Sequence, residues 1–139
     1  MTDMQAYSEI IKENLDLDIL YERYPFDKEF LEGIYDLILE TVLCKGRTII
    51  IASNEYSTEL VKGKFLKLNS SHIEYVMGCM QSNTTKVKNI KKYLLASLFN
   101  APATISGYYR AEVNFDMPQY ARTNYMEYAN SQDLVSWHT

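Results

Sequence analysis

The residues best suited to chemistry are seven lysines in the middle of the chain. They are Lys62, Lys64, Lys67, Lys86, Lys88, Lys91 and Lys92, and the last four fall within seven positions of the stretch TTKVKNIKKYLL (84–95). Clustered ammonium groups contact the phosphates of nucleic acids without reading the bases. The pattern predicts weak, sequence-independent DNA binding that falls steeply with salt. Lysine is also common on solvated helix surfaces, so a plain solvated face remains the alternative.

The net charge of −4 conceals a segregation of charge along the chain. Residues 1–44 carry three basic and eleven acidic side chains, residues 45–92 carry nine basic and three acidic ones, and residues 93–139 carry two basic and four acidic ones. A basic segment inside an acidic protein permits a local positive patch that the total charge hides. The carboxylates of residues 1–44 have the spacing of solvated helix faces.

The sequence offers little for catalysis, and we expect no enzyme activity, no cofactor and no metal. The G-x-G-x-x-G, P-loop and H-E-x-x-H patterns are absent. His72 shares a helix face with Cys79, but two ligands two turns apart do not make a zinc site. His72 is therefore predicted to be an ordinary surface or boundary histidine. Cys44 and Cys79 are predicted to be reduced residues of the core.

Hydrophobic periodicity predicts a mainly α fold, a compact bundle of five or six helices with one small β-hairpin near 47–56. A first helix is expected through Leu15, a second from about Asp16 to Arg23, and a third after Asp27 as its N-cap. The hairpin prediction comes from the β-branched run TIII (48–51) and the turn signal Ser53-Asn54. Later helices carry their apolar stripes through Val61 and Phe65, Ile73 and Met77, and Ile90, Leu94 and Leu98.

The last periodic helix is expected to stop at Asn100-Ala101-Pro102. Residues 106–117 are expected to pack on the bundle as an irregular chain. Residues 118–139 are predicted to be a weakly structured tail, which leaves a helical domain over residues 1–117. No apolar run reaches the ~20 residues that span a bilayer, and MTDMQAYSEI does not have the pattern of a signal peptide. We therefore expect a cytoplasmic protein without membrane contact.

The stretch VKGKFLKLNSSHIEYVMGCMQSNTTKVKNIKKYLLASLFNAPATISGYYRAEVNFDMP (61–118) resembles the C-terminal domain of replication initiator A proteins. Those proteins occur on plasmids and conjugative elements of Gram-positive bacteria. The most specific parts of the match are FLKLNSSHIEYV (65–76), TTKVKNIKKYLL (84–95) and FNAPATISGYY (99–109). The resemblance implies a separated or excised C-terminal module of an initiator, and that module has no assigned role in the family.

A fainter similarity is to the C-terminal domain of DnaD-like primosome proteins. Their last core helix carries Tyr, Ile and Trp at i, i+4 and i+8, and that region contributes to DNA binding. Ile90, Leu94 and Leu98 occupy this spacing here, with aliphatic side chains at both aromatic positions. Such a spacing is also the apolar stripe of any helix.

Two functions follow as expectations. The first is a non-enzymatic accessory module of a replication initiator that binds DNA through the seven lysines. The alternative is a protein–protein interaction module that recruits host replication proteins or oligomerises the initiator. The acidic first helices, the tyrosine-rich tail and the overall negative charge favour this alternative.

Overall fold

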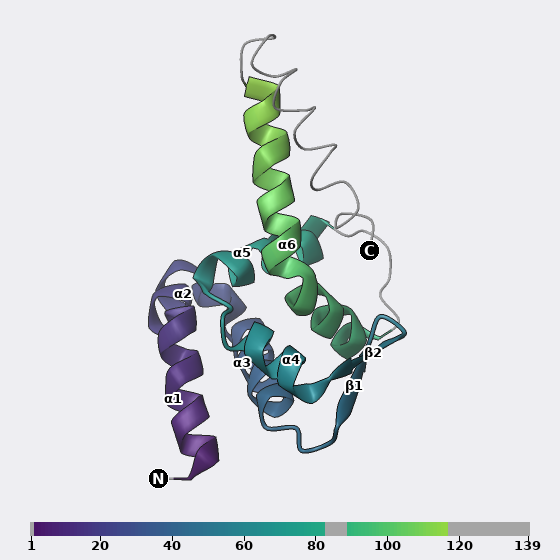
Figure 1. The fold of residues 1–139 in the computed structure, drawn as a ribbon. Helices are drawn as coiled ribbons and strands as arrows, with labels where there is room; N and C mark the ends of the chain where they lie inside the picture. The colour runs from purple at the N-terminus through teal and green to yellow at the C-terminus, as the bar shows by residue number, and fades with distance from the viewer. Residues whose placement is uncertain (1, 83–88, 117–139) are drawn as a thin grey trace. The chain divides into compact units, whose positions relative to one another are not determined.

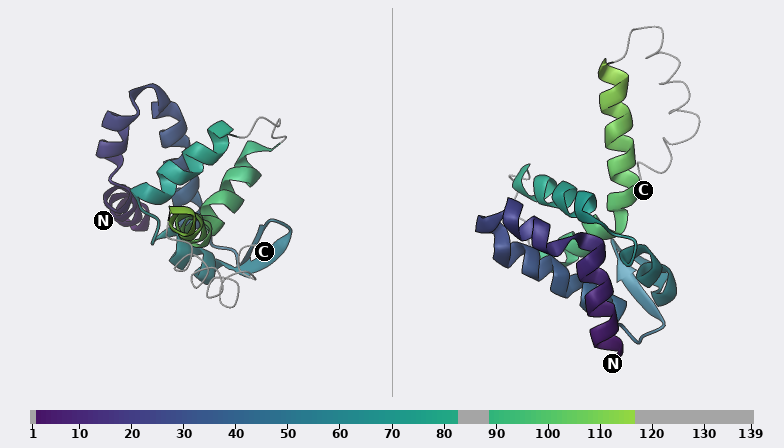
Figure 2. Two further views of the ribbon diagram at one scale, coloured as in Figure 1. Left: turned by 90° about the horizontal axis from the view of Figure 1, so that it is seen from above. Right: turned by 90° about the vertical axis from the view of Figure 1, so that its left-hand side faces the viewer.

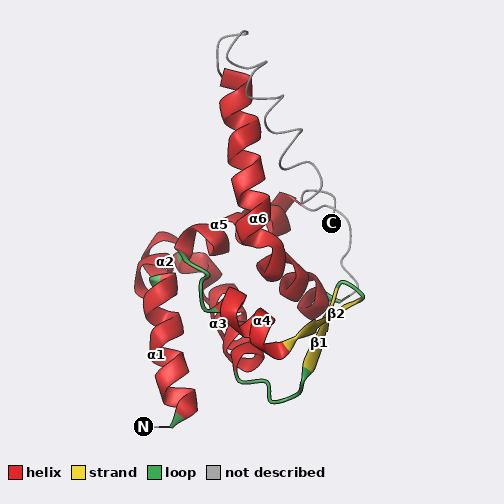
Figure 3. Ribbon diagram, in the orientation of Figure 1, coloured by secondary structure: helices red, strands yellow, loops and turns green. Residues whose placement is uncertain are grey.

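The computed structural model describes residues 2–82 and 89–116 of the 139-residue chain. It divides the chain into two compact units, Met1–Phe99 and Asn100–Thr139. The described residues form six α-helices, one 3-10 turn and one two-stranded antiparallel sheet (Figures 1 and 3). The predicted mainly α fold with a single small hairpin is therefore confirmed.

Two helices form the start of the first unit, α1 (Asp3–Leu15) and α2 (Leu17–Arg23). Thr2 caps α1: its hydroxyl accepts from the Gln5 N–H at 3.2 Å, and the Gln5 side chain accepts from the Thr2 N–H at 3.1 Å. This is a capping box, which satisfies donors that a helix start leaves open. Asp16 joins the helices with a left-handed φ of 49°, so the chain bends there as the two-helix prediction requires.

The central helix of the first unit is α3 (Lys28–Val42), which follows a 3-10 turn (Pro25–Asp27). It contacts α1, α2 and α4, and the purple and blue helices α1, α2 and α3 are adjacent in both views of Figure 2. Asp27 occupies the predicted N-cap position, but its side chain makes no capping hydrogen bond. The buried hydroxyl of Thr41 donates to the Leu37 carbonyl at 2.7 Å, which satisfies it inside the apolar face.

The hairpin consists of β1 (Thr48–Ile51) and β2 (Asn54–Ser57). Its turn residues are Ala52 and Ser53, with φ of 51° and 68°, rather than the predicted pair Ser53-Asn54. Two residues with positive φ define the type I′ geometry that matches the twist of a hairpin. Ile51 is buried, and the hairpin contacts α4, so a helix supports the two strands.

The turn residues Ala52 and Ser53 are not the pair that favours a type I′ turn most, which is Asn-Gly. We expect Ala52→Asn together with Ser53→Gly to raise the free energy of unfolding by about 1–2 kcal/mol, because asparagine and glycine adopt the left-handed region more readily than alanine and serine. Urea unfolding of the two proteins measures the difference. Ser53→Val, which adds a β-branched side chain at the same φ, serves as the opposite control and is expected to be destabilising. Equal stabilities for all three proteins would contradict the turn geometry.

Two further helices complete most of the core, α4 (Thr58–Phe65) and α5 (Ser70–Ser82). The Ser57 hydroxyl accepts from the Leu60 N–H at 3.2 Å and so caps the start of α4. The largest fully buried side chains come from α1 to α6 and the loop after α4, so one core joins elements from distant parts of the first unit. They are Ile11, Leu15, Leu20, Leu31, Ile34, Ile38, Val61, Phe65, Leu68, Ile73, Val76 and Leu98.

The last helix, α6 (Ile90–Asp116), corrects two predictions. It continues through Pro102 instead of stopping there, and residues 106–116 are helical instead of irregular. Proline removes one backbone hydrogen bond, but its fixed φ of about −65° is a helical value, so a helix that is favourable on both sides can continue. Leu94 and Leu98 are buried as predicted, whereas Ile90 at the helix start is 54% exposed.

Both cysteines are free, as predicted, but their predicted place in the core is wrong. Cys44 follows α3 in an exposed loop, and Cys79 is half-buried in α5. The predicted tail, residues 118–139, lies outside the described residues, so its weak structure and the domain limit at 117 stay predictions. None of the described helices combines the length and the apolar character needed to cross a membrane.

Candidate functional site

Three of the seven predicted lysines lie on or just after α4. The Lys62 ammonium lies 4.6 Å from the ring centroid of Tyr7 in α1, and the Lys64 ammonium lies 4.3 Å from the ring centroid of Phe99 in α6. Residues two apart on a helix point about 200° apart, which is why these two lysines meet different helices. A hydrogen bond with Tyr7 is the main reason that the pKa of Lys62 is raised. Lys67 is exposed.

Of the four lysines in residues 84–95, two lie within the described residues. Lys91 forms an ion pair with Glu40 of α3 at 2.9 Å, and both side chains are about two-thirds exposed, at 65% and 64%. Exposed pairs of this kind contribute little to stability. Lys92 is exposed, and Lys86 and Lys88 lie outside the described residues. Lys62, Lys64 and Lys91 therefore contact three different helices, and the predicted contact of all seven lysines with DNA stays a prediction.

A pocket of about 770 Å³ lies between α1, α2 and α3, and we call it the acidic groove. Its charged lining is six exposed carboxylates and one lysine. The lining residues are Glu9, Lys12, Glu13, Asp16, Leu17, Asp18, Ile19, Tyr21, Glu32, Tyr35 and Asp36. The groove is therefore strongly negative, with two tyrosines and two aliphatic side chains among its walls.

The helix geometry explains how so many carboxylates meet. Glu9 and Glu13 are four residues apart on α1, and Glu32 and Asp36 are four residues apart on α3, so each pair shares one helix face. Packing of α1 and α2 against α3 brings these faces together around the groove. Like charges four residues apart on a helix repel each other, so each of these pairs slightly lowers the stability of its helix.

Two tyrosines, Tyr21 and Tyr35, line the groove. Burial and then the charges of Glu32 and Asp36 raise the pKa of Tyr21, because a negative phenolate is disfavoured beside them. The Tyr35 hydroxyl forms a hydrogen bond with the Ser8 hydroxyl of α1. The Lys12 ammonium lies 5.5 Å from the centroid of the Tyr35 ring, within the range of a cation–π contact.

The sequence prediction missed the acidic groove as a site. It assigned the carboxylates of residues 1–44 to separate solvated faces, which is correct for each helix taken alone. The available signal was the excess of eleven acidic over three basic side chains in those residues. That excess indicates a negative region, but it does not show that residues from three helices surround one pocket.

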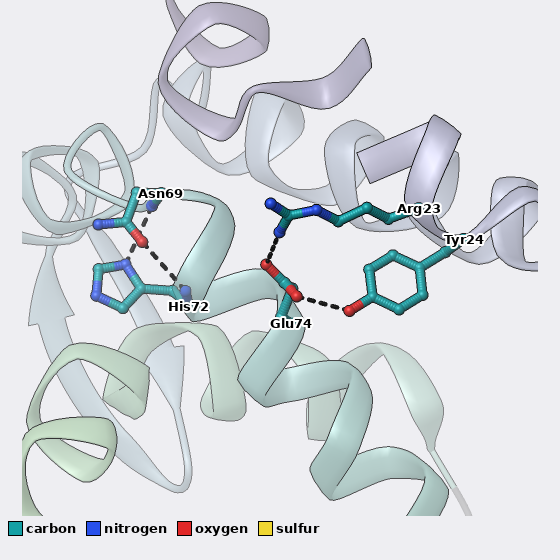
Figure 4. A network of polar contacts seen from close by, with 5 residues as sticks. All are labelled: Arg23, Tyr24, Asn69, His72 and Glu74. Carbon is teal, nitrogen blue, oxygen red and sulfur yellow. Dashed lines mark hydrogen bonds and ion pairs between the residues drawn. The ribbon is translucent and has the colours of Figure 1, made fainter. Parts of the chain in front are cut away.

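A polar network ties α2 to α5 and is drawn in Figure 4. The Glu74 carboxylate accepts from Arg23 at 3.0 Å and from the Tyr24 hydroxyl at 2.6 Å. The hydrogen bond to Glu74 is the main reason that the pKa of Tyr24 is raised. The network joins residues about fifty positions apart and links the end of α2, one of the three groove helices, to α5.

His72 has a structural role at the start of α5. Its Nδ1 accepts from the Asn69 N–H at 3.0 Å, and the Asn69 side-chain oxygen accepts from the His72 N–H at 3.2 Å (Figure 4). This reciprocal pair is a capping box with histidine in the place of the usual Glu or Gln. Burial lowers the pKa of His72 below 6.5, and a protonated Nδ1 cannot accept the Asn69 bond. Among the described residues, no group of three His, Cys, Asp or Glu side chains is placed to hold a metal ion.

The lowered pKa of His72 predicts a pH dependence of stability. The folded state disfavours the charged imidazole, so its contribution is fully present above the unfolded pKa of 6.5 and is lost as the pH falls through the lower folded pKa. We expect the free energy of unfolding to fall as the pH drops below 6.5. His72→Gln, which keeps an acceptor at the same capping position, should show a smaller fall. Identical pH profiles for the two proteins would contradict the role of the imidazole.

The sequence was compared with family models, with curated proteins and with solved structures, and only a family model matches it. Neither a curated protein nor a solved structure is found that matches it. The resemblance to replication initiator A and DnaD-like domains therefore stays a prediction. One family model, described as a family of unknown function (DUF6017), matches residues 1–119, which include every described helix and strand. The chain therefore belongs to the DUF6017 family.

Proposed function

We propose that the chain is a non-enzymatic protein–protein interaction module whose acidic groove binds a basic segment of a partner. The observation that carries the proposal is the lining of the groove, where five carboxylates from three helices and that of Asp16 between α1 and α2 are accompanied by one lysine. Carboxylates attract lysine and arginine side chains, and the tyrosine and aliphatic walls can cover the apolar stems of those side chains. The resemblance to an initiator module suggests a host replication protein as the partner.

The groove predicts the character of the interaction. Exposed charges steer association and are screened over about 8 Å at physiological salt. Binding of a basic peptide should therefore be weak and salt-sensitive, with a large part of the salt effect in the association rate.

The test is a charge neutralisation on the groove with a matched control. Glu32→Gln/Asp36→Asn removes two lining carboxylates, and Glu22→Gln/Glu29→Gln removes two exposed carboxylates that do not line the groove. We expect the first variant to bind a nine-residue polyarginine peptide about tenfold more weakly, equivalent to about 1.4 kcal/mol. The control should change affinity less than twofold. Fluorescence anisotropy at low salt measures both, and equal effects of the two variants would sink the proposal.

Sequence-independent DNA binding remains a second candidate, because Lys67 and Lys92 are exposed within the basic middle segment. The same anisotropy assay with a labelled DNA duplex distinguishes the two functions. Retention of the duplex that weakens steeply with salt would favour the lysines, with log affinity falling by about 0.9 per neutralised phosphate for each log unit of salt. No retention at low salt leaves the acidic groove as the proposed interface.

A further inference from the structure

We infer that the Tyr35 ring in the acidic groove is the seat for one arginine side chain of the basic partner, and that Lys12 occupies this seat in the free chain. The inference rests on the proposed function and names the group that the groove recognises. It follows from the position of a cation that the chain itself supplies. The Lys12 ammonium lies over the Tyr35 ring at 5.5 Å from its centroid, at the wall of the pocket.

The Tyr35 ring is held in position and can receive a cation. Its hydroxyl is hydrogen-bonded to Ser8, and the residue is half-buried between α1 and α3. Glu32 and Asp36 are its close neighbours on α3, and both line the groove. A ring flanked by carboxylates suits a guanidinium in particular, because the planar group stacks on the ring while its N–H donors reach the acids.

Lys12 is a weakly held occupant. It is exposed, and among the ion pairs of the described residues none involves Lys12, although carboxylates surround it. A cation–π contact at an exposed site is weak, so an arginine from a partner can displace the ammonium and stack in its place. The lysine side chain has many rotamers and can swing out to solvent. In the free chain Lys12 therefore covers the ring and lowers the affinity for a second cation.

The test removes Lys12 and compares it with a matched lysine. Lys28 also lies over a tyrosine ring of this region, at 5.5 Å from the Tyr21 centroid, but it does not line the groove. Lys12→Gln and Lys28→Gln therefore remove the same charge at two positions. We expect Lys12→Gln to bind the polyarginine peptide about fivefold more tightly, by loss of competition and repulsion at the ring. We expect Lys28→Gln to change affinity by less than twofold.

The ring itself is tested in the Lys12→Gln background. Adding Tyr35→Leu removes the π face and should abolish the gain, whereas adding Tyr35→Phe keeps the face and should retain it. A polylysine peptide of the same length should gain less from Lys12→Gln than polyarginine does, because an ammonium does not stack. Circular dichroism of each variant confirms the fold, and Lys12→Gln alone decides the matter if Tyr35→Leu does not fold, because Lys12 is exposed.

Three results would overturn the inference. Equal gains from Lys12→Gln and Lys28→Gln would mean that Lys12 acts only through the total charge. A full gain with Tyr35→Leu would mean that the ring is not the seat. Peptide affinity that falls as the protein concentration rises would assign the groove to a second copy of the chain. The first two results leave the proposed function standing if Glu32→Gln/Asp36→Asn still weakens peptide binding, so the two failures are distinguishable.

Discussion

Replacing Phe65 by alanine is expected to lower the free energy of unfolding by about 3–5 kcal/mol, the range for loss of a buried aromatic side chain. Phe65 is 2% exposed and is the largest of the fully buried side chains. It lies in α4, an eight-residue helix that is too short to persist without its packing. The substitution leaves a cavity next to the core that joins α4 to α3. Urea unfolding followed by circular dichroism measures the loss.

Phe26 provides a matched control for this prediction. It stands in the 3-10 turn before α3 and is 99% exposed, so the same Phe→Ala change removes no buried contact there. We expect Phe26→Ala to alter stability by less than about 0.5 kcal/mol. A loss for Phe65→Ala below that level, or similar losses at the two positions, would contradict the burial of Phe65 in the core.

Replacing Pro102 by alanine is expected to stabilise α6 by about 3 kcal/mol, the difference between proline and alanine inside a helix. Pro102 lies within α6, twelve residues after Ile90, where it cannot donate to the carbonyl four residues earlier. Alanine restores that donor and removes the clash of the ring with the carbonyl. The gain should appear as greater ellipticity at 222 nm and as a higher free energy of unfolding.

The control for Pro102 is its exposed neighbour Ala103. Ala103→Gly should destabilise the same helix by about 1 kcal/mol, since glycine is a poorer helix former than alanine. Opposite signs for the two variants would support one continuous helix. If Pro102→Ala leaves both ellipticity and stability unchanged, the helix does not run through residue 102 and the earlier prediction of a stop there is restored.

Much of the fold was determined by the sequence itself, because its signals are local. The stripe of Ile34 and Ile38 specifies the buried face of α3, and the β-branched run at 48–51 specifies a strand. Ser57 provides a hydroxyl at the right place to cap α4. Each of these signals depends on neighbours within a few positions, so periodicity and turn chemistry are enough to recognise them.

The continuation of α6 was not determined in this way. Proline at residue 102 is compatible both with the end of a helix and with an interior position that lacks one hydrogen bond. The choice depends on the summed preferences of the residues on both sides and on their packing, and no single local rule expresses that sum. Local signals also did not determine the exposure of Cys44 and Ile90, because burial depends on which element packs against a residue.

The candidate site was decided by the tertiary structure. Amphipathic spacing shows that Glu9 and Glu13 share a face of α1 and that Glu32 and Asp36 share a face of α3. It does not show that packing turns both faces toward one groove, nor that Lys62 and Lys64 diverge to α1 and α6. The net charge of a segment follows from counting its residues in the sequence. A binding site also requires charged residues from distant segments to lie close together in space. Only the packing of α1 and α2 against α3 supplies those distances.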